Sequence, residues 1–463
     1  MPDQQATERG ASIDRERLAR LIDRERATYA GRHPASRAAF AAAGRNLLGG
    51  VPMTWMRMWP GGFPLYLASA HGARLTDIDG HELIDFCLGD TGAMAGHSPA
   101  PVQAAVARQY AVVGGATTML PTQDAAWVAA DLTRRFGPTH WSFTLTATDA
   151  NRWAIRLARQ LTRRPKILVF SYCYHGSVDE SFIVLGPDGP QSRPGNVGAP
   201  VDPSETTRVV EFNDLAALER ELAAGDVAVV LMEPALTNIG IVLPEPGYLD
   251  AVRELTRAAG TLLINDETHT FSAGPGGCTR AWNLDPDIVT IGKSIAGGIP
   301  AGAFGLAADL ADRILHDESA DIEDTGGVGG TLAGNALSVA AMRATLERVL
   351  TDAAFTTMIS LADRYTAGVR GVIETRALPW NIVQLGARAE YRFCPQPPRT
   401  GGESDAAADL QLDEYLHLYT VNRGVLMTPF HNMALMCPAT AEADVDTHTQ
   451  IFGAAADELL RQL

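Results

Sequence analysis

Two charged residues of this sequence each follow a short apolar run. Asp266 follows the run TLLIN, and Lys293 follows the run DIVTIG. Runs of this kind predict buried strands of an α/β sheet, which binds its ligands at the carboxyl ends of its strands. A lysine amine forms a Schiff base with the aldehyde of pyridoxal 5'-phosphate, and a carboxylate keeps the ring nitrogen of that cofactor protonated. The pair therefore predicts pyridoxal phosphate chemistry, with Lys293 and Asp266 as catalytic residues.

The segment from about 100 to 310 alternates predicted strands with helices or loops. The strands are FTL, ILVF, VAVVLM, TLLIN, DIVTIG and AFGL, and a helix is predicted from Asp149. This alternation predicts an α/β fold with a mostly parallel sheet that helices cover on both faces. The stretch 178–207 is rich in Gly, Pro, Ser and Asp, and it predicts a long surface loop at an active site or an interface.

The two ends of the chain have different patterns from this central segment. Residues 12–29 have the apolar spacing of one amphipathic helix. Residues 64–88 alternate apolar and polar side chains around DIDG, which predicts antiparallel strands and a hairpin. Two helices and the strands NIVQLG, AEYRF and GVLMT follow residue 338. We predict a small α+β domain from the two ends of the chain and a large cofactor domain between them, with segments 1–98, 99–337 and 338–463.

The composition excludes several classes of function. The 463 residues exceed the usual size of one hydrophobic core, and the net charge of −16 argues against a nucleic-acid partner. The apolar runs are much shorter than the roughly 20 residues of a membrane span. The polar N-terminus lacks a signal-peptide core, so we expect a cytoplasmic protein. Five scattered cysteines form no CxxC pair and have no His partner at ligand spacing, so no metal site is predicted.

Longer motifs carry a family resemblance. They are the stretch from Glu233 to Glu267, the segment GKSIAGGIPAGAFG from Gly292, and GTLAGN; Asp266 and Lys293 are 27 residues apart (293 − 266). Through them the chain, from about residue 48 onwards, resembles the class III aminotransferases, which are pyridoxal phosphate enzymes of fold type I. Within that family it most resembles the glutamate-1-semialdehyde aminomutase-like group. The resemblance implies the fold type I architecture and a Schiff base on Lys293.

The resemblance also implies a phosphate site at the start of a helix. The segment TATDAN aligns with the family's SGTEAN and makes Thr146, Ala147 and Thr148 the phosphate cradle. Helix N-termini bind anions through free N–H groups and the helix dipole. A capping role for Thr148 remains open. The segment GGT matches a family Gly-Thr that contacts phosphate from the other subunit, which implies Gly330, Thr331 and a homodimer with a shared active site.

The remaining cofactor residues come from three further motifs. In SYCYHGS, the resemblance implies that Tyr174 stacks on the ring and that His175 shapes its surroundings. In EPALTN, Glu233 and Asn238 are expected near the ring hydroxyl. Thr268 stands where most relatives carry an apolar residue on the ring face. Purely structural roles for His175 and Glu233 remain open.

Substrate choice is expected in two segments that border the site in this family, GGVPMTWMRMWPGG and GVLMTPFHNMALM. Both are rich in Met, Trp and Phe, which predicts an apolar pocket. Relatives that act on β-amino acids carry an arginine in each segment, where this chain has Met53 and Phe430. Arg57 or Arg388 could replace them, because a guanidinium binds a carboxylate with two hydrogen bonds. The candidate substrate residues are Trp55, Arg57, Arg388, Phe430 and His431.

We predict a transaminase. It would move an amino group from a hydrophobic amine or amino acid donor to a keto acid or aldehyde acceptor. The altered TATDAN segment, Thr268 and the apolar segments favour this function. The strong match over 233–267 keeps an aminomutase or epimerase as the alternative. A binding or regulatory protein that has lost turnover is a further alternative, which the intact Lys293 and Asp266 oppose.

Overall fold

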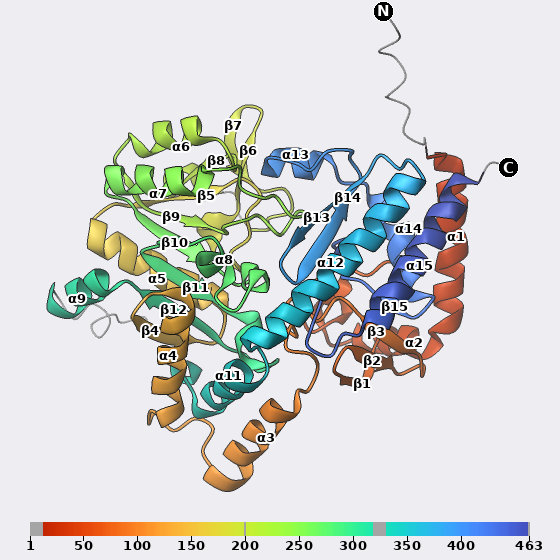
Figure 1. Ribbon diagram of the computed structural model, residues 1–463, viewed down its shortest axis with the longest axis horizontal. Helices are drawn as coiled ribbons and strands as arrows, with labels where there is room; N and C mark the ends of the chain where they lie inside the picture. Colours follow the sequence, from red (N-terminus) through yellow and green to blue (C-terminus); the bar gives the residue numbers. More distant parts are fainter. Residues whose placement is uncertain (1–12, 199–200, 318–329, 462–463) are drawn as a thin grey trace, which may run out of the picture. The chain divides into compact units, whose positions relative to one another are not determined.

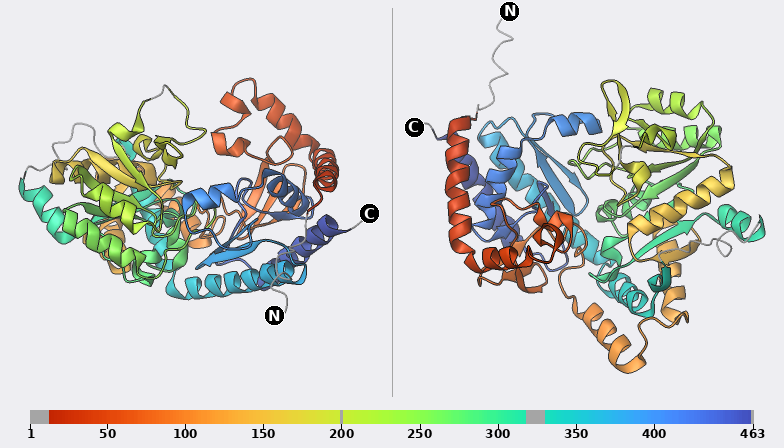
Figure 2. Two further views of the ribbon diagram at one scale, coloured as in Figure 1. Left: turned by 90° about the horizontal axis from the view of Figure 1, so that it is seen from above. Right: turned by 180° about the vertical axis from the view of Figure 1, so that it is seen from behind.

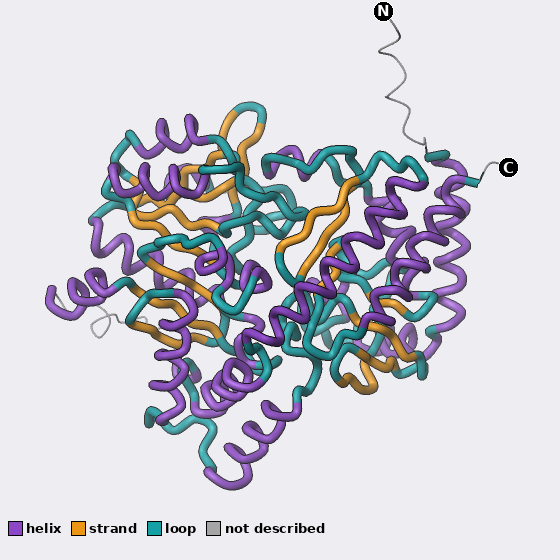
Figure 3. The backbone as a smooth tube through the Cα atoms, in the orientation of Figure 1, coloured by secondary structure: helices purple, strands orange, loops and turns teal. Residues whose placement is uncertain are grey.

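The computed structural model describes residues 13–198, 201–317 and 330–461, and the chain forms two compact units (Figures 1 and 3). The first unit combines Met1–Asp90, Thr357–Pro397 and Ala407–Leu463; the second combines Thr91–Thr356 and Pro398–Ala406. The boundaries predicted at 98 and 337 both fall inside the second unit. The predicted division into three segments remains a prediction.

The second unit is built on a seven-stranded sheet in the order β4-β12-β11-β10-β9-β5-β8. Only β12 runs antiparallel to its neighbours, β11 and β4. The mostly parallel α/β sheet predicted from the sequence is therefore confirmed. Its strands are β4 (His140–Thr144), β5 (Lys166–Phe170), β8 (Thr207–Val210), β9 (Val227–Met232), β10 (Leu262–Asp266), β11 (Ile288–Ile291) and β12 (Gly302–Leu306).

Helices cover both faces of this sheet. Helix α7 (Tyr248–Ala259) lies in front of the sheet in Figure 1, whereas α5 (Ala147–Thr162) lies in front in the reversed view of Figure 2. Right-handed crossovers explain the two faces, because the chain moves along the sheet in opposite directions through α5 and α7. Helix α5 buries Ala150, Trp153, Ala154 and Leu157. This i, i+3, i+4, i+7 spacing gives the helix one apolar face.

The other helices of the second unit extend this arrangement. Helix α6 (Leu215–Leu222) contacts α7 and β8, and α11 (Ala336–Arg348) contacts α3 (Ala100–Arg108) and α4 (Gln123–Phe136). Among the described residues, no helix is both long and apolar enough to cross a membrane. The remaining helices are α8 (Gly277–Ala281), α9 (Ala308–Asp317) and α13 (Gly401–Ala406).

The prediction of one long loop over 178–207 is wrong for the residues of this segment that the structure describes. Strands β6 (Ile183–Gly186) and β7 (Gly189–Ser192) form an antiparallel hairpin, and β8 begins at Thr207. The short run IVL and the Asp-Gly pair at 188–189 are a hairpin signal that the Gly and Pro content of the segment obscures. Residues 199 and 200 lie outside the described part of the chain.

The first unit contains two smaller sheets, in the orders β1-β2-β3-β15 and β13-β14-β16. The antiparallel pairing predicted for 64–88 is confirmed. Two helices were predicted after residue 338 without bounds, and the described chain has more than two there; one of them is α14 (Leu410–Val421), which has two thirds of its residues buried and shows no clear polar face. The other elements are α1 (Arg15–Arg32), α2 (Pro34–Ala43), α12 (Asp352–Thr375), α15 (Glu442–Leu460), β1 (Leu67–His71), β2 (Arg74–Asp77), β3 (Glu82–Asp85), β13 (Asn381–Leu385), β14 (Arg388–Arg392), β15 (Val425–Leu426) and β16 (Met433–Leu435).

A buried histidine makes the folding stability of the first unit depend on pH. His448 on α15 is fully buried against Tyr365 and Phe452, and burial lowers its pKa to about 3. In the unfolded chain, the His448 ring takes up a proton below its ordinary pKa of about 6.5. In the folded chain it stays neutral down to about pH 3. The stabilisation is therefore fully present above pH 6.5 and is lost as the pH falls toward 3.

We predict that protonation of His448 in the unfolded chain lowers the free energy of unfolding by about 2 kcal/mol between pH 7 and pH 5. His448→Phe keeps a ring at the site but cannot take up a proton, so its unfolding free energy should fall less over the same interval. Urea unfolding of both proteins at the two pH values measures the difference. An equal fall in both proteins would show that His448 is not the cause.

Candidate active site

The predicted cofactor residues follow the strands of the seven-stranded sheet. Asp266 is the last residue of β10, Lys293 lies two residues beyond the end of β11, and Glu233 follows β9 directly. Strands β10 and β11 are parallel neighbours in which Asp266 pairs with Thr290. Side chains at the carboxyl ends of parallel strands meet at one edge of the sheet, where open α/β folds bind ligands.

Asp266 is buried and is held by three donors. Its Oδ2 accepts from Asn151 Nδ2 at 2.8 Å and from His175 Nδ1 at 2.8 Å, and its Oδ1 accepts from Thr268 N at 3.1 Å. A carboxylate only accepts hydrogen bonds, so the His175 ring carries a proton on Nδ1. These contacts fix the orientation of the carboxylate.

The same contacts keep the Asp266 carboxylate ionised. Burial opposes its charge, but the hydrogen bond from His175, with those from Asn151 and Thr268, leaves the pKa of Asp266 below its usual value. Burial also opposes a charge on His175, yet neighbouring Cys173 and Asp266 raise the pKa of His175 well above its usual value. Fixed donors therefore hold an ionised Asp266 carboxylate inside the protein, paired with His175.

Asn151 is a site residue that the sequence analysis quoted within TATDAN but did not select. It lies on α5, and besides Asp266 it donates to His175 O at 3.2 Å and accepts from Thr290 Oγ1 at 2.6 Å. It thus joins the helix to β10, β11 and the segment after β5. Its place in the first turns of a helix that starts at the phosphate motif is the signal that could have identified it.

Lys293 occupies a restricted backbone conformation beside a histidine. Its φ is +50°, and it begins the short 3₁₀ turn η7 (Lys293–Ala296). Its Nζ lies 2.8 Å from His269 Nε2, while His269 Nδ1 lies 3.2 Å from Thr91 Oγ1. His269, which the sequence analysis did not select, follows Asp266 by three residues. This contact lets His269 hold Lys293 Nζ in place.

The TATDAN segment forms the start of α5, as predicted. Thr146 is the N-cap, and its Oγ1 accepts from Asp149 N at 3.2 Å. Thr148 Oγ1 accepts from Ser177 N at 3.0 Å. A Cβ built on Gly176 would lie 2.0 Å from Thr148 Oγ1, so the backbone after His175 closes tightly onto the helix start. The N-terminus of this 16-residue helix points its N–H groups toward the tight loop, an arrangement that suits an anion.

These groups fit pyridoxal phosphate. The helix start suits its phosphate, the ionised Asp266 suits a protonated ring nitrogen, and Lys293 supplies a primary amine. The three features all belong to the second unit of the chain.

Other predicted cofactor residues occupy more varied positions in the second unit. Thr268 is buried beside Asp266, and Tyr174 is half-buried in the segment after β5. Glu233 is buried, with Oε1 accepting from Thr237 Oγ1 at 2.5 Å, and Asn238 lies in the same loop. Gly330 and Thr331 form an exposed turn, η8 (Gly330–Leu332), and the rest of DTGGVGGT, residues 324–329, lies outside the described chain.

Glu267, next to Asp266, has a structural role. Its buried carboxylate accepts from Thr270 Oγ1, from Thr279 N and Oγ1, and from Cys278 N. Burial raises its pKa despite these bonds. Glu267 thereby ties the turn after β10 to α8, which fixes the backbone that carries Thr268 and His269.

The candidate substrate residues all lie in the first unit. The rings of Trp55 and Phe430 are 4.8 Å apart, and those of Phe430 and His431 are 5.2 Å apart. Arg57 is exposed, whereas Arg388 on β14 is completely buried. Glu390, two residues along the same strand, has a pKa kept below its usual value, against burial, by His431 and by the charges of Arg388 and Arg392. Their roles toward a substrate stay predictions.

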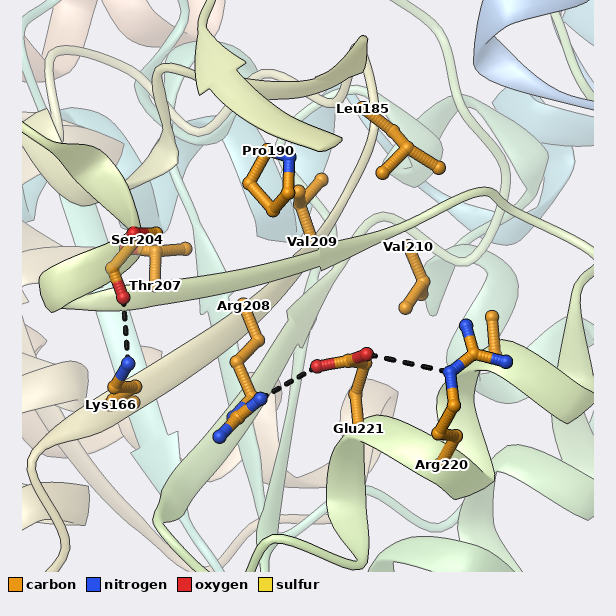
Figure 4. A pocket seen from close by; sticks show the side chains of 11 residues that line it. Lys166, Leu185, Pro190, Ser204, Thr207, Arg208, Val209, Val210, Arg220 and Glu221 are labelled. Atoms are coloured by element: carbon orange, nitrogen blue, oxygen red, sulfur yellow. Dashed lines mark hydrogen bonds and ion pairs between the residues drawn. The ribbon is translucent and has the colours of Figure 1, made fainter. Parts of the chain in front are cut away.

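Figure 4 shows a separate surface pocket of about 210 Å³ at the β8 edge of the sheet. Its cationic groups are already engaged: Lys166 Nζ donates to Ser204 O at 2.7 Å, and Arg208 pairs with Glu221 at 2.7 Å. None of the predicted site residues lines it. The pocket is lined by Lys166, Leu185, Pro190, Ser204, Thr207, Arg208, Val209, Val210, Ala217, Arg220 and Glu221.

We predict that Gly176→Ala lowers cofactor affinity at least tenfold and the free energy of unfolding by about 1–3 kcal/mol, because the new methyl group overpacks against Thr148. Gly225→Ala is the matched control: its φ of +72° resembles the +76° of Gly176, but nothing lies within 4 Å of its Cβ. Fluorescence titration of the apoenzymes with pyridoxal phosphate measures the affinities. Equal losses in the two variants would contradict the importance of this close contact.

Comparisons with known proteins identify the family of this chain. The sequence model of the family "Aminotransferase class-III" matches residues 58–446. Glutamate-1-semialdehyde 2,1-aminomutase of Opitutus terrae is 33% identical over 407 residues, which cover 86% of this chain and 93% of that protein.

Solved structures give the same result. A glutamate-1-semialdehyde-aminomutase from Pseudomonas aeruginosa PAO1 is 48% identical with a TM-score of 0.93, over 97% of this chain and 100% of that one. A lysine-to-alanine variant of that protein was solved in complex with PMP. An omega-transaminase from Sphaerobacter thermophilus is 29% identical with a TM-score of 0.82, over 92% of this chain and 98% of that one. This chain therefore belongs to the class-III aminotransferase family, whose members are pyridoxal phosphate enzymes of fold type I.

Proposed function

We propose that this chain is a pyridoxal phosphate-dependent aminomutase, which moves an amino group between neighbouring carbons of one substrate. The observation that carries this proposal is its likeness to the Pseudomonas aeruginosa aminomutase, with 48% identity over 97% of the chain. From the sequence alone, this function is the alternative to a transaminase. By this likeness the substrate class is an α-amino aldehyde with a distal carboxylate, the chemistry of glutamate 1-semialdehyde.

The proposed roles of the residues follow from their contacts. Bound pyridoxal phosphate supplies a carbonyl for the substrate amine and a ring that withdraws electrons from the reacting carbon. Asp266 carries the charge opposite the ring nitrogen, and His175 and Asn151 are its positioning residues. Lys293 holds the cofactor and transfers the proton. His269 positions Lys293 Nζ and shares its proton.

The start of α5 and the loop at Gly176 hold the phosphate in this proposal. Thr146, Ala147 and Thr148 supply N–H and hydroxyl groups at the positive end of the helix. These three residues are uncharged, so they would bind the phosphate through the helix dipole and hydrogen bonds, beside the Asp149 carboxylate, which accepts from Thr146 Oγ1 at 2.9 Å. Gly330 and Thr331 would add contacts from a second subunit.

A transaminase is the second candidate, and the residues beside Asp266 favour it. Thr268 occupies the position where most relatives carry an apolar residue, and the TATDAN segment differs from the family's SGTEAN. The omega-transaminase from Sphaerobacter thermophilus shares 29% identity over 92% of this chain. The aromatic pair Trp55 and Phe430 would then form an apolar wall for a hydrophobic donor.

The proposed enzyme is a homodimer. An apolar segment in the second unit supports this: it includes η3 (Gln109–Val113), and several large side chains between 110 and 120 are exposed. Contiguous exposed apolar surface is typical of an interface. The segment exposes Tyr110, Val112, Val113, Met119 and Leu120.

Sedimentation should therefore give the mass of two chains, near twice 49.4 kDa. Replacing Val112 and Leu120 together by glutamate should shift the protein toward a single chain, because two buried charges weaken an apolar interface. A wild-type protein that sediments as one chain would contradict the dimer.

The function is tested with the holoenzyme and glutamate 1-semialdehyde as the single substrate. An aminomutase should form the isomer with the amino group on carbon 1 and the carbonyl on carbon 2 without any keto acid. Lys293→Ala should lower the turnover by on the order of 10³-fold or more while the protein still binds pyridoxamine phosphate, because it loses the proton-transferring amine.

The transaminase predicts a different outcome. A hydrophobic amine or amino acid donor would convert the bound cofactor to pyridoxamine phosphate, and sustained turnover would require a keto acid or aldehyde. Absence of the isomer together with this acceptor dependence would reject the aminomutase. Absence of both activities and of cofactor absorbance would instead support the non-catalytic alternative.

A further inference from the structure

Three polar side chains of the first unit converge on one another. His33 lies at the junction of α1 and α2, Asp77 ends β2, and His81 lies in the turn before β3. Asp77 Oδ2 lies 3.5 Å from His33 Nε2 and 3.1 Å from His81 Nδ1. One nitrogen or oxygen atom from each residue lies within 4.8 Å of the others.

The orientation of His33 is set by the backbone. Its Nδ1 lies 2.8 Å from Tyr29 O, and because a carbonyl oxygen can only accept, Nδ1 carries the proton of this ring. In the neutral ring, Nε2 is then a lone pair, and it faces the Asp77 carboxylate.

A cation between Asp77 Oδ2 and His33 Nε2 would interact with both atoms. His33 and Asp77 are each 1% exposed, so bulk water would screen this interaction little. His81 Nδ1 adds a second nitrogen next to the same oxygen atom. The side chain of His81 is 26% exposed, which gives an ion a path from solvent.

The two distances from Asp77 are close to those of a metal centre, and the three ligand atoms lie within 4.8 Å of one another. Zinc binds histidine nitrogen and carboxylate oxygen at about 2.0–2.2 Å, so two ligands of a tetrahedral centre lie about 3.4 Å apart. The observed separations are 3.5 and 3.1 Å. Tyr29 O orients the His33 ring, and His81 N donates to Asp77 Oδ1 at 2.8 Å, so two of the three ligands have the outer hydrogen bonds typical of metal sites.

We propose that His33, Asp77 and His81 bind a divalent transition-metal ion, with zinc as the best fit to two imidazoles and one carboxylate. The ion joins the α1–α2 junction to the β2–β3 turn. Asp79 in the same turn already accepts from Ala35 N, Ser36 N and Ser36 Oγ, so the metal would strengthen an existing connection. The role is structural, and it does not depend on the proposed function.

The sequence alone predicted no metal site, because the ligands do not form a motif. His33 and Asp77 are 44 residues apart (77 − 33), and only the packing of α1 and α2 on the hairpin brings them together. The spacing of Asp77 and His81 is an ordinary feature of a DIDGH turn. The three-dimensional cluster therefore carries information that the linear sequence does not.

The test uses the full-length holoenzyme after treatment with a chelator. Titration with ZnCl₂ in competition with a chromogenic chelator should give one tight site per chain, and CoCl₂ should give visible d–d absorption bands. His81→Ala removes a partly exposed ligand and should weaken zinc binding at least tenfold; Asp77→Asn should do the same with little change in shape. Zinc should raise the unfolding temperature of the wild-type protein and not that of the two variants.

His71→Ala is the matched control, because His71 is an exposed histidine on β1 of the same sheet. It should bind zinc as the wild-type protein does. The five cysteines remain in all variants, so any zinc bound by thiols appears equally in each titration. The proposal is overturned if the wild-type protein binds no zinc. It is also overturned if the wild-type protein, His81→Ala and Asp77→Asn bind zinc equally well.

Discussion

A buried carboxylate with fixed donors is the constraint on which the second unit depends. An ionised aspartate inside a protein is costly unless hydrogen bonds replace its water. Asp266 obtains these from Asn151 on α5, from His175 after β5 and from the backbone of Thr268. The donors come from separate segments, so the sheet, the first turns of α5 and the loop after β5 must all be in place for the charge to be stable.

The sheet that positions Asp266 also positions Lys293. Parallel pairing of β10 with β11 brings Lys293 to the edge where Asp266 ends its strand. Glu267, next to Asp266, fixes the turn that carries His269 to Lys293 Nζ. One strand end therefore supplies the buried charge, the structural carboxylate and the partner of the lysine within four consecutive residues. This compact arrangement links the stability of the fold directly to its chemistry.

The sequence predicted the parts of this arrangement that have local signals. Strand-length apolar runs gave β10 and β11, and the motif at Thr146 gave the start of α5, because such patterns reflect burial and helix capping. Asn151 and His269 were not selected, since their importance comes from partners 115 and 24 residues away. The hairpin β6–β7 was also missed, because its turn residues resemble those of an irregular loop. Long-range side-chain pairing is what a single sequence does not reveal.

The central claim is that Asp266 keeps the ring nitrogen of the cofactor protonated. It is tested most directly by ¹⁵N NMR of holoenzyme loaded with pyridoxal phosphate that is labelled at the ring nitrogen. The account predicts the chemical shift of a protonated pyridine in the wild-type protein at neutral pH and of an unprotonated pyridine in Asp266→Asn, because the amide cannot stabilise the added charge. The same shift in both proteins would contradict the account.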